Sequence, residues 1–164
     1  MVRETRYYNN GDRYDGEAEG KGIWYGDNGD SYEGEWKNDS KEGKGIYYYA
    51  DGDRYEGEWK NGLIEGKGIY YYKNGDRYEG DYKNDKREGK GKLSYTNFFY
   101  DGDWVNDKKE GKGILKDEFG EYDGQFLNNL KDGNFKEYDT ENNQELTFEN
   151  LKKSLLKENE LIIK

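Results

Sequence analysis

One block of about fifteen residues recurs six times along this chain, and this repetition constrains the fold more than any other feature. The clearest copy runs from Tyr55 to Ile69. A period of roughly 20 to 50 residues is typical of repeat architectures, in which each unit packs only on its neighbours. We therefore expect a long, regular surface rather than one central pocket. The copies start 18, 23, 23, 22 and 22 residues apart, at Tyr14, Tyr32, Tyr55, Tyr78, Tyr100 and Tyr122.

The composition favours a folded chain with a thin core made of aromatic rings. Only 30% of the 164 residues are hydrophobic and 39% are charged, a balance that by itself indicates disorder. Aromatic residues, however, make up 17% of the chain, with 18 Tyr, 4 Trp and 6 Phe. Each ring buries a large apolar area, so a few rings can stabilise a core in which aliphatic residues are scarce.

The third block predicts two strands joined as a hairpin. Residues 55–60 alternate an aromatic residue or glycine with a charged residue, which is the pattern of a half-exposed strand. Residues 66–72 alternate in a similar way, so residues 61–65 form a connection of about five residues. Tight type I′ turns between successive hairpins are predicted by Asn-Gly and Asp-Gly pairs before the tyrosine strands. These pairs are Asn10-Gly11, Asn28-Gly29, Asp51-Gly52 and Asn74-Gly75.

The two faces of the predicted sheet differ in chemistry. Glycines such as Gly57 and Gly68 lie on the aromatic face, where we expect a ring from a neighbouring repeat to lie flat over bare backbone. The other face carries carboxylates such as Glu56 and lysines such as Lys67, which can pair across strands. A catalytic carboxylate pair needs two unlike environments, whereas a repeating row makes all sites alike. We interpret this face as solvated and salt-bridged.

The blocks resemble the MORN repeat (membrane occupation and recognition nexus), whose pattern is Tyr-x-Gly-x-Trp followed by Gly-x-Gly. Residues 32–36 read Tyr-Glu-Gly-Glu-Trp and residues 43–45 read Gly-Lys-Gly, and the likeness covers about residues 7–138. The resemblance implies an all-β, elongated single-sheet meander of about six β-hairpins. The aromatic residues at the first and fifth positions are the predicted repeat core: Tyr32, Trp36, Tyr55, Trp59, Tyr78, Tyr82, Tyr100, Trp104, Tyr122 and Phe126.

The ends of the chain depart from this pattern. The first block has Ala18 in place of the aromatic residue and lacks about five loop residues, so its hairpin should be very tight. We divide the chain into a repeat array over residues 1–139 and a helical extension over residues 140–164, which residues 142–145 can open as a capping box. The helix either caps the last repeat or docks on a partner. Its apolar stripe consists of Phe148, Leu151, Leu155 and Ile162.

The residue types also exclude several kinds of chemistry. The chain has no Cys and no His, so it lacks the thiolate metal ligand, the commonest general base and the commonest transition-metal ligand. Asp51-Gly52-Asp53 and Asn74-Gly75-Asp76 resemble fragments of calcium loops, but turn chemistry explains them without a metal. We predict no cofactor, no metal and no catalytic residue, and we expect that the chain is not an enzyme.

These observations favour a structural or scaffold protein. The resemblance implies an assembly module, often of cilia or the cytoskeleton, whose partners are other proteins in a larger complex. Exposed rings such as Tyr48, Tyr71, Phe98 and Phe99 suit protein binding, and a homodimer stays open. The net charge of −10 argues against nucleic acid and membranes. We expect an intracellular, cytoplasmic protein, because residues 1–6 do not form a secretory signal.

The alternative function is binding to a phospholipid surface. Basic residues fall at equivalent places in the hairpin connections, which would make one rim of the sheet locally basic. These residues are Lys41, Lys86, Arg87, Lys108 and Lys109.

Overall fold

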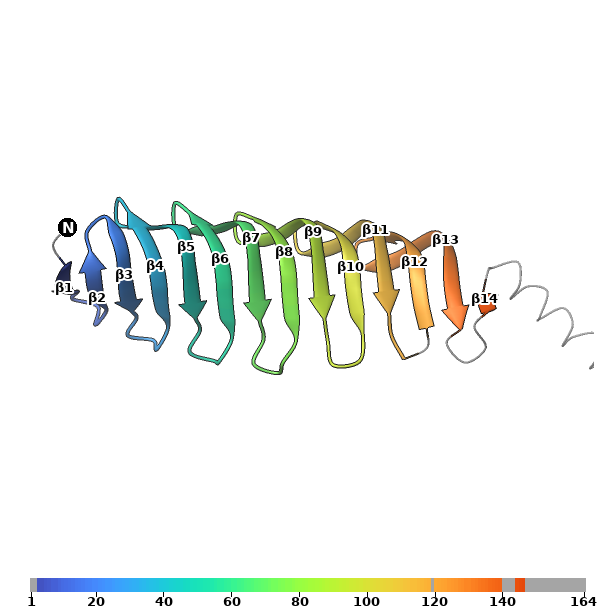
Figure 1. The fold of residues 1–164 in the computed structure, drawn as a ribbon, viewed down its shortest axis with the longest axis horizontal. Coiled ribbons are helices and arrows are strands. Elements are labelled where there is room, and N and C mark those ends of the chain that lie inside the picture. Colours follow the sequence, from blue (N-terminus) through green and yellow to red (C-terminus); the bar gives the residue numbers. More distant parts are fainter. Residues whose placement is uncertain (1–2, 119, 140–143, 147–164) are drawn as a thin grey trace, which may run out of the picture.

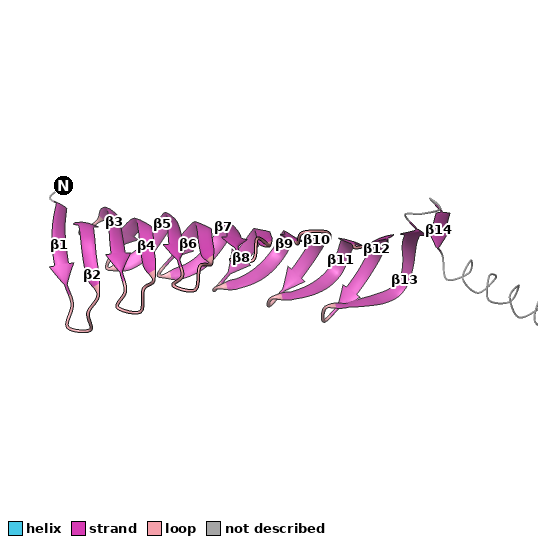
Figure 2. Cartoon of the chain, turned by 90° about the horizontal axis from the view of Figure 1, so that it is seen from below, coloured by secondary structure: helices cyan, strands magenta, loops and turns pink. Residues whose placement is uncertain are grey.

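The computed structural model describes residues 3–118, 120–139 and 144–146, and these residues form one antiparallel sheet. Its fourteen strands lie in sequence order, so each strand pairs only with its neighbours along the chain (Figure 1). The described residues are strands and loops without a helix (Figure 2). The predicted all-β meander of hairpins is confirmed for this part of the chain. The described residues therefore include no helix that could span a membrane.

The strands are mostly five to ten residues long. Their bounds are β1 (Arg3–Tyr7), β2 (Arg13–Glu17), β3 (Gly20–Tyr25), β4 (Ser31–Lys37), β5 (Ser40–Tyr48), β6 (Arg54–Lys60), β7 (Leu63–Tyr71), β8 (Arg77–Lys83), β9 (Lys86–Ser94), β10 (Phe99–Val105), β11 (Lys108–Lys116), β12 (Gly120–Leu127), β13 (Leu130–Asp139) and β14 (Gln144–Leu146).

The hairpin connections are shorter than predicted, which corrects the five-residue loop at residues 61–65. Strand β6 ends at Lys60 and β7 begins at Leu63, so that only Asn61 and Gly62 form the turn. Both have positive φ, 50° and 83°, as a type I′ turn requires. We call these two-residue turns the tips. They are Asn38-Asp39, Asn61-Gly62, Asn84-Asp85, Asn106-Asp107 and Asn128-Asn129.

The remaining residues of the predicted loop form a β-bulge inside the hairpin. The register of β6 against β7 shifts between Gly57 and Trp59, so Glu65, Gly66 and Lys67 lie across from the single residue Glu58. Gly66 has a φ of +68°, the left-handed conformation that glycine adopts at this kind of bulge. This backbone requirement explains the first glycine of the Gly-x-Gly motifs in the second to fifth repeats, Gly43, Gly66, Gly89 and Gly111.

The connections at the other ends of the strands are not the predicted type I′ turns. Only the glycine of each Asn-Gly or Asp-Gly pair has positive φ, such as Gly52 at +101°. The Gly52 N–H donates to Tyr49 O at 3.0 Å, and the Tyr49 N–H donates to Asp53 O at 3.0 Å. This arrangement is a three-residue hairpin loop that ends on a left-handed glycine.

Tyrosine rings lie flat over the paired glycines, as expected, but each ring comes from the same repeat rather than from a neighbouring one. Gly57 and Gly68 face each other across β6 and β7. A Cβ atom on Gly68 would lie 2.2 Å from the Tyr55 hydroxyl and 2.5 Å from its ring. The second glycine of the motif therefore makes room for the tyrosine of its own hairpin.

The predicted C-terminal helix, residues 140–164, is described by the structure at residues 144–146, and these residues are not helical. Residues 144–146 form β14, which pairs with β13, in place of the expected opening helical turn. The amide and carbonyl groups of β13 thus bind another strand there. The proposed docking stripe of Phe148, Leu151, Leu155 and Ile162 lies outside the described residues.

Candidate protein-interaction surfaces

The aromatic face of the sheet is held together within each repeat by the first tyrosine. The Tyr32 ring is fully buried, and its hydroxyl donates to Glu35 O at 3.2 Å. It meets the edge of Trp36 with a centroid distance of 5.2 Å and an interplanar angle of 85°. It meets Trp59 of the next repeat in the same way, at 5.2 Å and 78°. Such edge-to-face contacts are favourable beyond the area that they bury.

The fifth-position aromatic residue connects neighbouring repeats. Trp59 Nε1 donates to Gly45 O of the preceding repeat at 3.3 Å, and Trp104 Nε1 donates to Gly91 O at 2.8 Å. Trp36 makes the same contact with Gly22 O at 3.2 Å, although it is only half-buried. The other predicted core aromatics are all buried: Tyr32, Tyr55, Trp59, Tyr78, Tyr82, Tyr100, Trp104, Tyr122 and Phe126.

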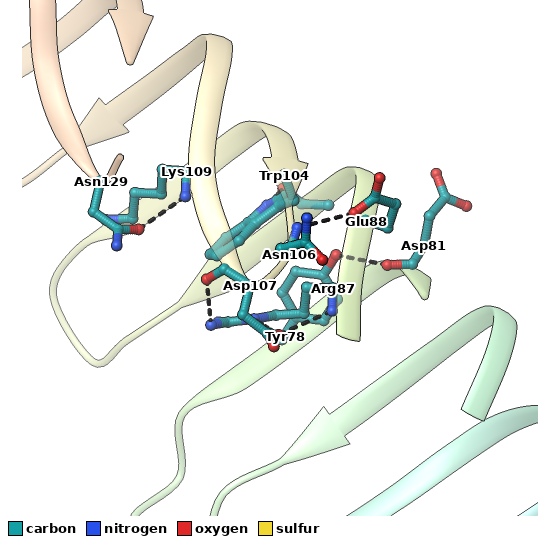
Figure 3. A network of polar contacts seen from close by, with 10 residues as sticks. Tyr78, Asp81, Arg87, Glu88, Trp104, Asn106, Asp107, Lys109 and Asn129 are labelled. Atoms are coloured by element: carbon teal, nitrogen blue, oxygen red, sulfur yellow. Dashed lines mark hydrogen bonds and ion pairs between the residues drawn. The ribbon is translucent and has the colours of Figure 1, made fainter. Parts of the chain in front are cut away.

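A row of mostly cationic side chains lies over these rings. The Lys41 ammonium is 4.2 Å from the centroid of the Tyr47 ring and 4.8 Å from that of Trp59. The Arg87 guanidinium is 4.2 Å from the Trp104 ring, and the two lie against each other in Figure 3. Burial lowers the pKa of Lys41, although Asp85 and Asp30 oppose this shift. Cation–π attraction therefore acts here on partly desolvated cations.

The tips stack on one another through a ladder of hydrogen bonds. The Asn106 N–H donates to the Glu88 carboxylate of the preceding repeat at 2.9 Å, and the Asp107 N–H donates to Arg87 O at 3.0 Å (Figure 3). In return, the Arg87 N–H donates to the Asp107 carboxylate at 2.9 Å. The same pattern joins Asn61 to Glu42, at 2.9 Å. Each tip is thus fixed to the hairpin before it.

Aspartates fix the three-residue loops at the opposite ends of the strands. Asp30 accepts hydrogen bonds from the Tyr47 hydroxyl and the Ala50 N–H, both at 2.8 Å. Burial opposes the ionisation of Asp30, but these hydrogen bonds outweigh it and lower the pKa of the carboxyl group. Asp53 binds the Tyr70 hydroxyl at 2.8 Å and the Lys73 N–H at 2.9 Å in the same way. Among the described residues no acidic cluster could hold a metal ion.

The other face of the sheet forms a groove of about 1300 Å³, which we call the charged groove. It extends from Arg3 to Asp101 and therefore crosses most repeats. Its floor is a row of paired glycines, in which Gly34 faces Gly45 and Gly57 faces Gly68. The side-chain positions of these glycines point to the aromatic face, so on the groove side the floor is strand backbone between the charged and aliphatic side chains.

Charged and aliphatic side chains alternate along the sides of the charged groove. Glu33 faces Ile46 and Glu56 faces Ile69 across paired strands. Ion pairs join successive repeats, such as Lys67 with Asp81 at 2.5 Å. These ion pairs are solvated and contribute little to stability, since exposed pairs are typically worth less than about 1 kcal/mol. The isoleucines were not among the predicted functional residues, although they alternate in register with the lysines of the second strands.

The basic residues predicted for a membrane-facing rim do not form one continuous surface. Lys41 and Arg87 are directed over rings of the aromatic face, as is Lys109, whose ammonium lies 5.0 Å from the centroid of Tyr100. Lys86 and Lys108 remain exposed.

The exposed rings predicted to bind proteins differ in how they are covered. Tyr48 is 39% exposed and Phe98 is 40% exposed, and Phe98 stacks on Tyr95. Tyr71 carries the Arg54 guanidinium at 4.2 Å. Phe99 carries the Lys92 ammonium at 4.1 Å. The register places Tyr48, Tyr71 and Phe99 in one row across the strands, with Arg54 between the first two and Arg77 and Ser94 between the last two.

Comparison with known proteins identifies the repeat. A family model described as the MORN repeat matches six segments, which are residues 14–31, 32–54, 55–77, 78–98, 100–117 and 122–134. A comparison with curated protein sequences finds no match.

Solved structures with a similar fold include two from Drosophila melanogaster. The SAS-4 (dCPAP) TCP domain, in complex with a proline-rich motif of Ana2 (dSTIL), superposes with a TM-score of 0.57 and 17% identity. That match covers 88% of this chain and 81% of the other. The TCP10c domain of Sas-4 superposes with a TM-score of 0.51 and 16% identity, covering 88% of this chain and 97% of the other. At this identity the likeness concerns the fold alone.

Proposed function

Because the chain belongs to the MORN-repeat family, we propose that it is a non-catalytic scaffold that holds segments of partner proteins within a larger assembly. The observation that carries this proposal is the charged groove, which crosses successive repeats without interruption. Each repeat adds a similar set of groups to it, so the groove suits an elongated ligand better than a small substrate.

The chemistry of the charged groove fits a polypeptide segment. Ile46 and Ile69 offer apolar contacts at regular intervals, while Glu56 and Glu79 offer acceptors and negative charge between them. A partner segment with basic and apolar side chains at matching intervals would find both kinds of contact.

Two further considerations support the scaffold proposal. The TCP domain of SAS-4, which has a similar fold, is seen in complex with a short motif of another protein. In addition, MORN proteins as a family resemble one another in acting as assembly modules, often in ciliary or cytoskeletal structures. We propose an intracellular assembly of this kind for the present chain.

Binding to a phospholipid surface is less well supported. A membrane-binding rim needs several exposed cations close together. Lys41 and Lys109 instead rest on rings, and both have a lowered pKa, chiefly because burial disfavours their charge. We therefore keep lipid binding as an outcome of the test.

The test is a crosslinking pull-down from native extract with two variants. The double variant Glu56→Lys, Glu79→Lys reverses charge inside the charged groove. Glu118→Lys makes the same change at an exposed position in the loop between β11 and β12. We expect the wild type and Glu118→Lys to recover the same stoichiometric proteins, and the groove variant to lose them.

Two other outcomes would count against the proposal. Partners that survive the groove variant would place binding on another surface. If the folded wild-type chain recovers no protein but floats with anionic liposomes, then the scaffold proposal is wrong and the lipid alternative replaces it.

A further inference from the structure

Five repeats place one long side chain over their aromatic face, directly across from the fifth-position ring. The register pairs Trp36 with Lys41, and Tyr82 with Arg87. Four of these five side chains are cations that rest on rings, and the fifth is aliphatic. The five side chains are Lys41, Ile64, Arg87, Lys109 and Lys131.

The first repeat lacks both members of this pair. Ala18 stands where the other repeats have an aromatic ring, and β3 begins at Gly20 without the extra residues that would carry the cation. The space is left as a hollow of about 470 Å³. Tyr14, Trp24 and Trp36 are among its lining residues, and we call this hollow the N-terminal basin.

The rings of the N-terminal basin are equivalent to the rings that hold Lys41. Trp24 faces Tyr14 as Tyr47 faces Tyr32 in the next repeat. Trp36 meets Tyr14 at 5.1 Å and 79°, which matches the contact of Trp59 with Tyr32 at 5.2 Å and 78°. The basin therefore presents the aromatic surroundings of a bound lysine without a lysine of its own repeat.

We propose that the N-terminal basin binds a lysine or arginine side chain from a partner protein. This inference rests on the proposed scaffold function and names one contact that it uses. The aliphatic stem would lie along Tyr14 and Trp36, and the charged head would reach Trp24, as Lys41 does against its own rings.

The charges around the N-terminal basin are compatible with a cation. Asp12 and Asp39 line it, together with Arg6 and Lys41. Hydrogen bonds from the Asp27 N–H and from Trp24 lower the pKa of Asp12, although burial opposes them, so its carboxylate stays ionised beside the ring. Arg6 pairs closely with Glu4 and reaches Asp39 only at 3.5 Å, so an incoming cation can share the exposed Asp39 carboxylate.

The Lys41 ammonium lies 5.8 Å from the Trp24 ring centroid, farther than from its closest rings, Tyr47 and Trp59, and it does not exclude a second cation. Arg87, Lys109 and Lys131 occupy three successive repeats, so this face already holds cations in adjacent positions. The acidic chain, with a net charge of −10, also favours the approach of a basic partner.

The experiment uses the full chain and nuclear magnetic resonance of its 4 Trp side chains, with Nα-acetyl-lysine amide as the probe. We expect the indole N–H signals of Trp24 and Trp36 to shift with added probe. The signals of Trp59 and Trp104, which are buried, should stay in place. The neutral norleucine analogue should bind about five-fold more weakly, because it lacks the cation–π contact.

A pair of variants separates the basin from a general effect on the sheet. Leucine stands at the position of Trp24 in two other repeats, as Leu93 and Leu115, so Trp24→Leu should fold. It should abolish the shift of the Trp36 signal. Tyr70→Leu changes the equivalent ring of the third repeat and should leave probe binding intact.

The outcomes distinguish this inference from the scaffold proposal. Equal shifts of all the tryptophan signals, or none, would overturn the basin as a lysine site even if the pull-down recovers partners. Selective shifts that Trp24→Leu does not remove would also overturn it. Conversely, a basin that binds the probe while the pull-down fails would keep the site and refute the scaffold.

Discussion

The first and third repeats share the same tyrosine motif but differ in how completely they cover it. In the third repeat, Tyr55 lies between Trp59 and Tyr82, and both contacts are edge-to-face at 5.3 Å. In the first repeat, Tyr14 has a ring contact with Trp36 alone among the described aromatic pairs. The tip of the third hairpin also binds the repeat before it.

The difference shows that hairpin length, rather than the Tyr-x-Gly core, decides whether a repeat fills its own aromatic layer. The interior hairpins contain a bulge that leads into the tip. This segment carries the hydrogen-bond acceptor for the next tip and the side chain that covers the rings, such as Lys41 or, in the third repeat, Ile64. Without it, the first hairpin keeps its tyrosine over the glycines and leaves the ring layer above it open.

The largest expected effect is the loss of an interior tryptophan. Trp59→Ala should lower the free energy of unfolding by about 3–5 kcal/mol, because the ring is 5% exposed and contacts two tyrosines. Trp36→Ala should cost about half as much, because Trp36 is half-buried beside the basin. Urea unfolding followed by circular dichroism measures both. Equal losses would contradict the comparison.

A methyl group on the glycine under the tyrosine should have the next largest effect. Gly68→Ala places a Cβ atom 2.2 Å from the Tyr55 hydroxyl, and overpacking of this kind typically costs about 1–3 kcal/mol. Gly22→Ala makes the same clash with Tyr14, at 2.1 Å, but Tyr14 can move toward the N-terminal basin. The cost of Gly22→Ala in urea unfolding should therefore be the smaller one. A larger cost for Gly22→Ala would show that the basin gives Tyr14 no room.

Acid should destabilise the three-residue loops around Asp12 and Asp30 to a similar extent. The first repeat differs from the second at its tip but not at this loop. Asp12 and Asp30 both have a pKa below the ordinary 3.8 in the folded chain. Their contribution to stability is present above 3.8 and is lost as the pH falls through the lower folded values.

Asp12→Asn and Asp30→Asn should each reduce the fall in the urea midpoint between neutral pH and acid, by a similar and modest amount. Lys73→Gln, at an exposed loop position, is the control and should leave the pH profile unchanged. A pH profile that only Asp30→Asn alters would show that the two loop ends are not equivalent.

The smallest expected effect is a gain in stability. Lys41→Ile copies the residue that the third repeat has at this place, Ile64, and removes a charge whose lowered pKa reflects burial. The free energy of unfolding should rise by about 0.5 kcal/mol, the lower end of such substitutions. Lys60→Ile, at an exposed site, is the control and should not stabilise. A loss of stability in Lys41→Ile would mean that cation–π attraction outweighs desolvation.

The sequence predicted the strand pattern and the aromatic side of the sheet, because period-2 alternation is a local signal that the packing does not alter. The predicted type I′ turns, however, lie at the opposite ends of the strands from the observed ones. Asn74-Gly75 matches the type I′ pattern, but its chain reverses through a three-residue loop, and the real type I′ turns include pairs without glycine, such as Asn84-Asp85. The signal for the real tips is an asparagine at the same place in the second to sixth repeats, which an alignment of the repeats shows.

The candidate sites were less predictable because they depend on relations between repeats. No local pattern shows that Lys41 lies over rings of the adjacent repeats, Trp24 and Trp59, because these contacts arise only from stacking. The N-terminal basin follows from a deletion, visible in the sequence only as a short spacing between Tyr14 and Tyr32. Its lining consists of rings equivalent to those around Lys41, and this equivalence follows from the strand register.

The strict sequence order of the strands has a geometric consequence. Each repeat adds two strands, and strands lie about 4.8 Å apart, so every repeat lengthens the molecule by about 10 Å. Equivalent surface groups therefore recur along the molecule at a constant spacing. Partners bound at two points would be held at a separation that counts the repeats between them. Removal of residues 55–77, one complete repeat, would shorten that separation by about 10 Å. The second and fourth repeats could then pack on each other through the same contacts that neighbouring repeats make.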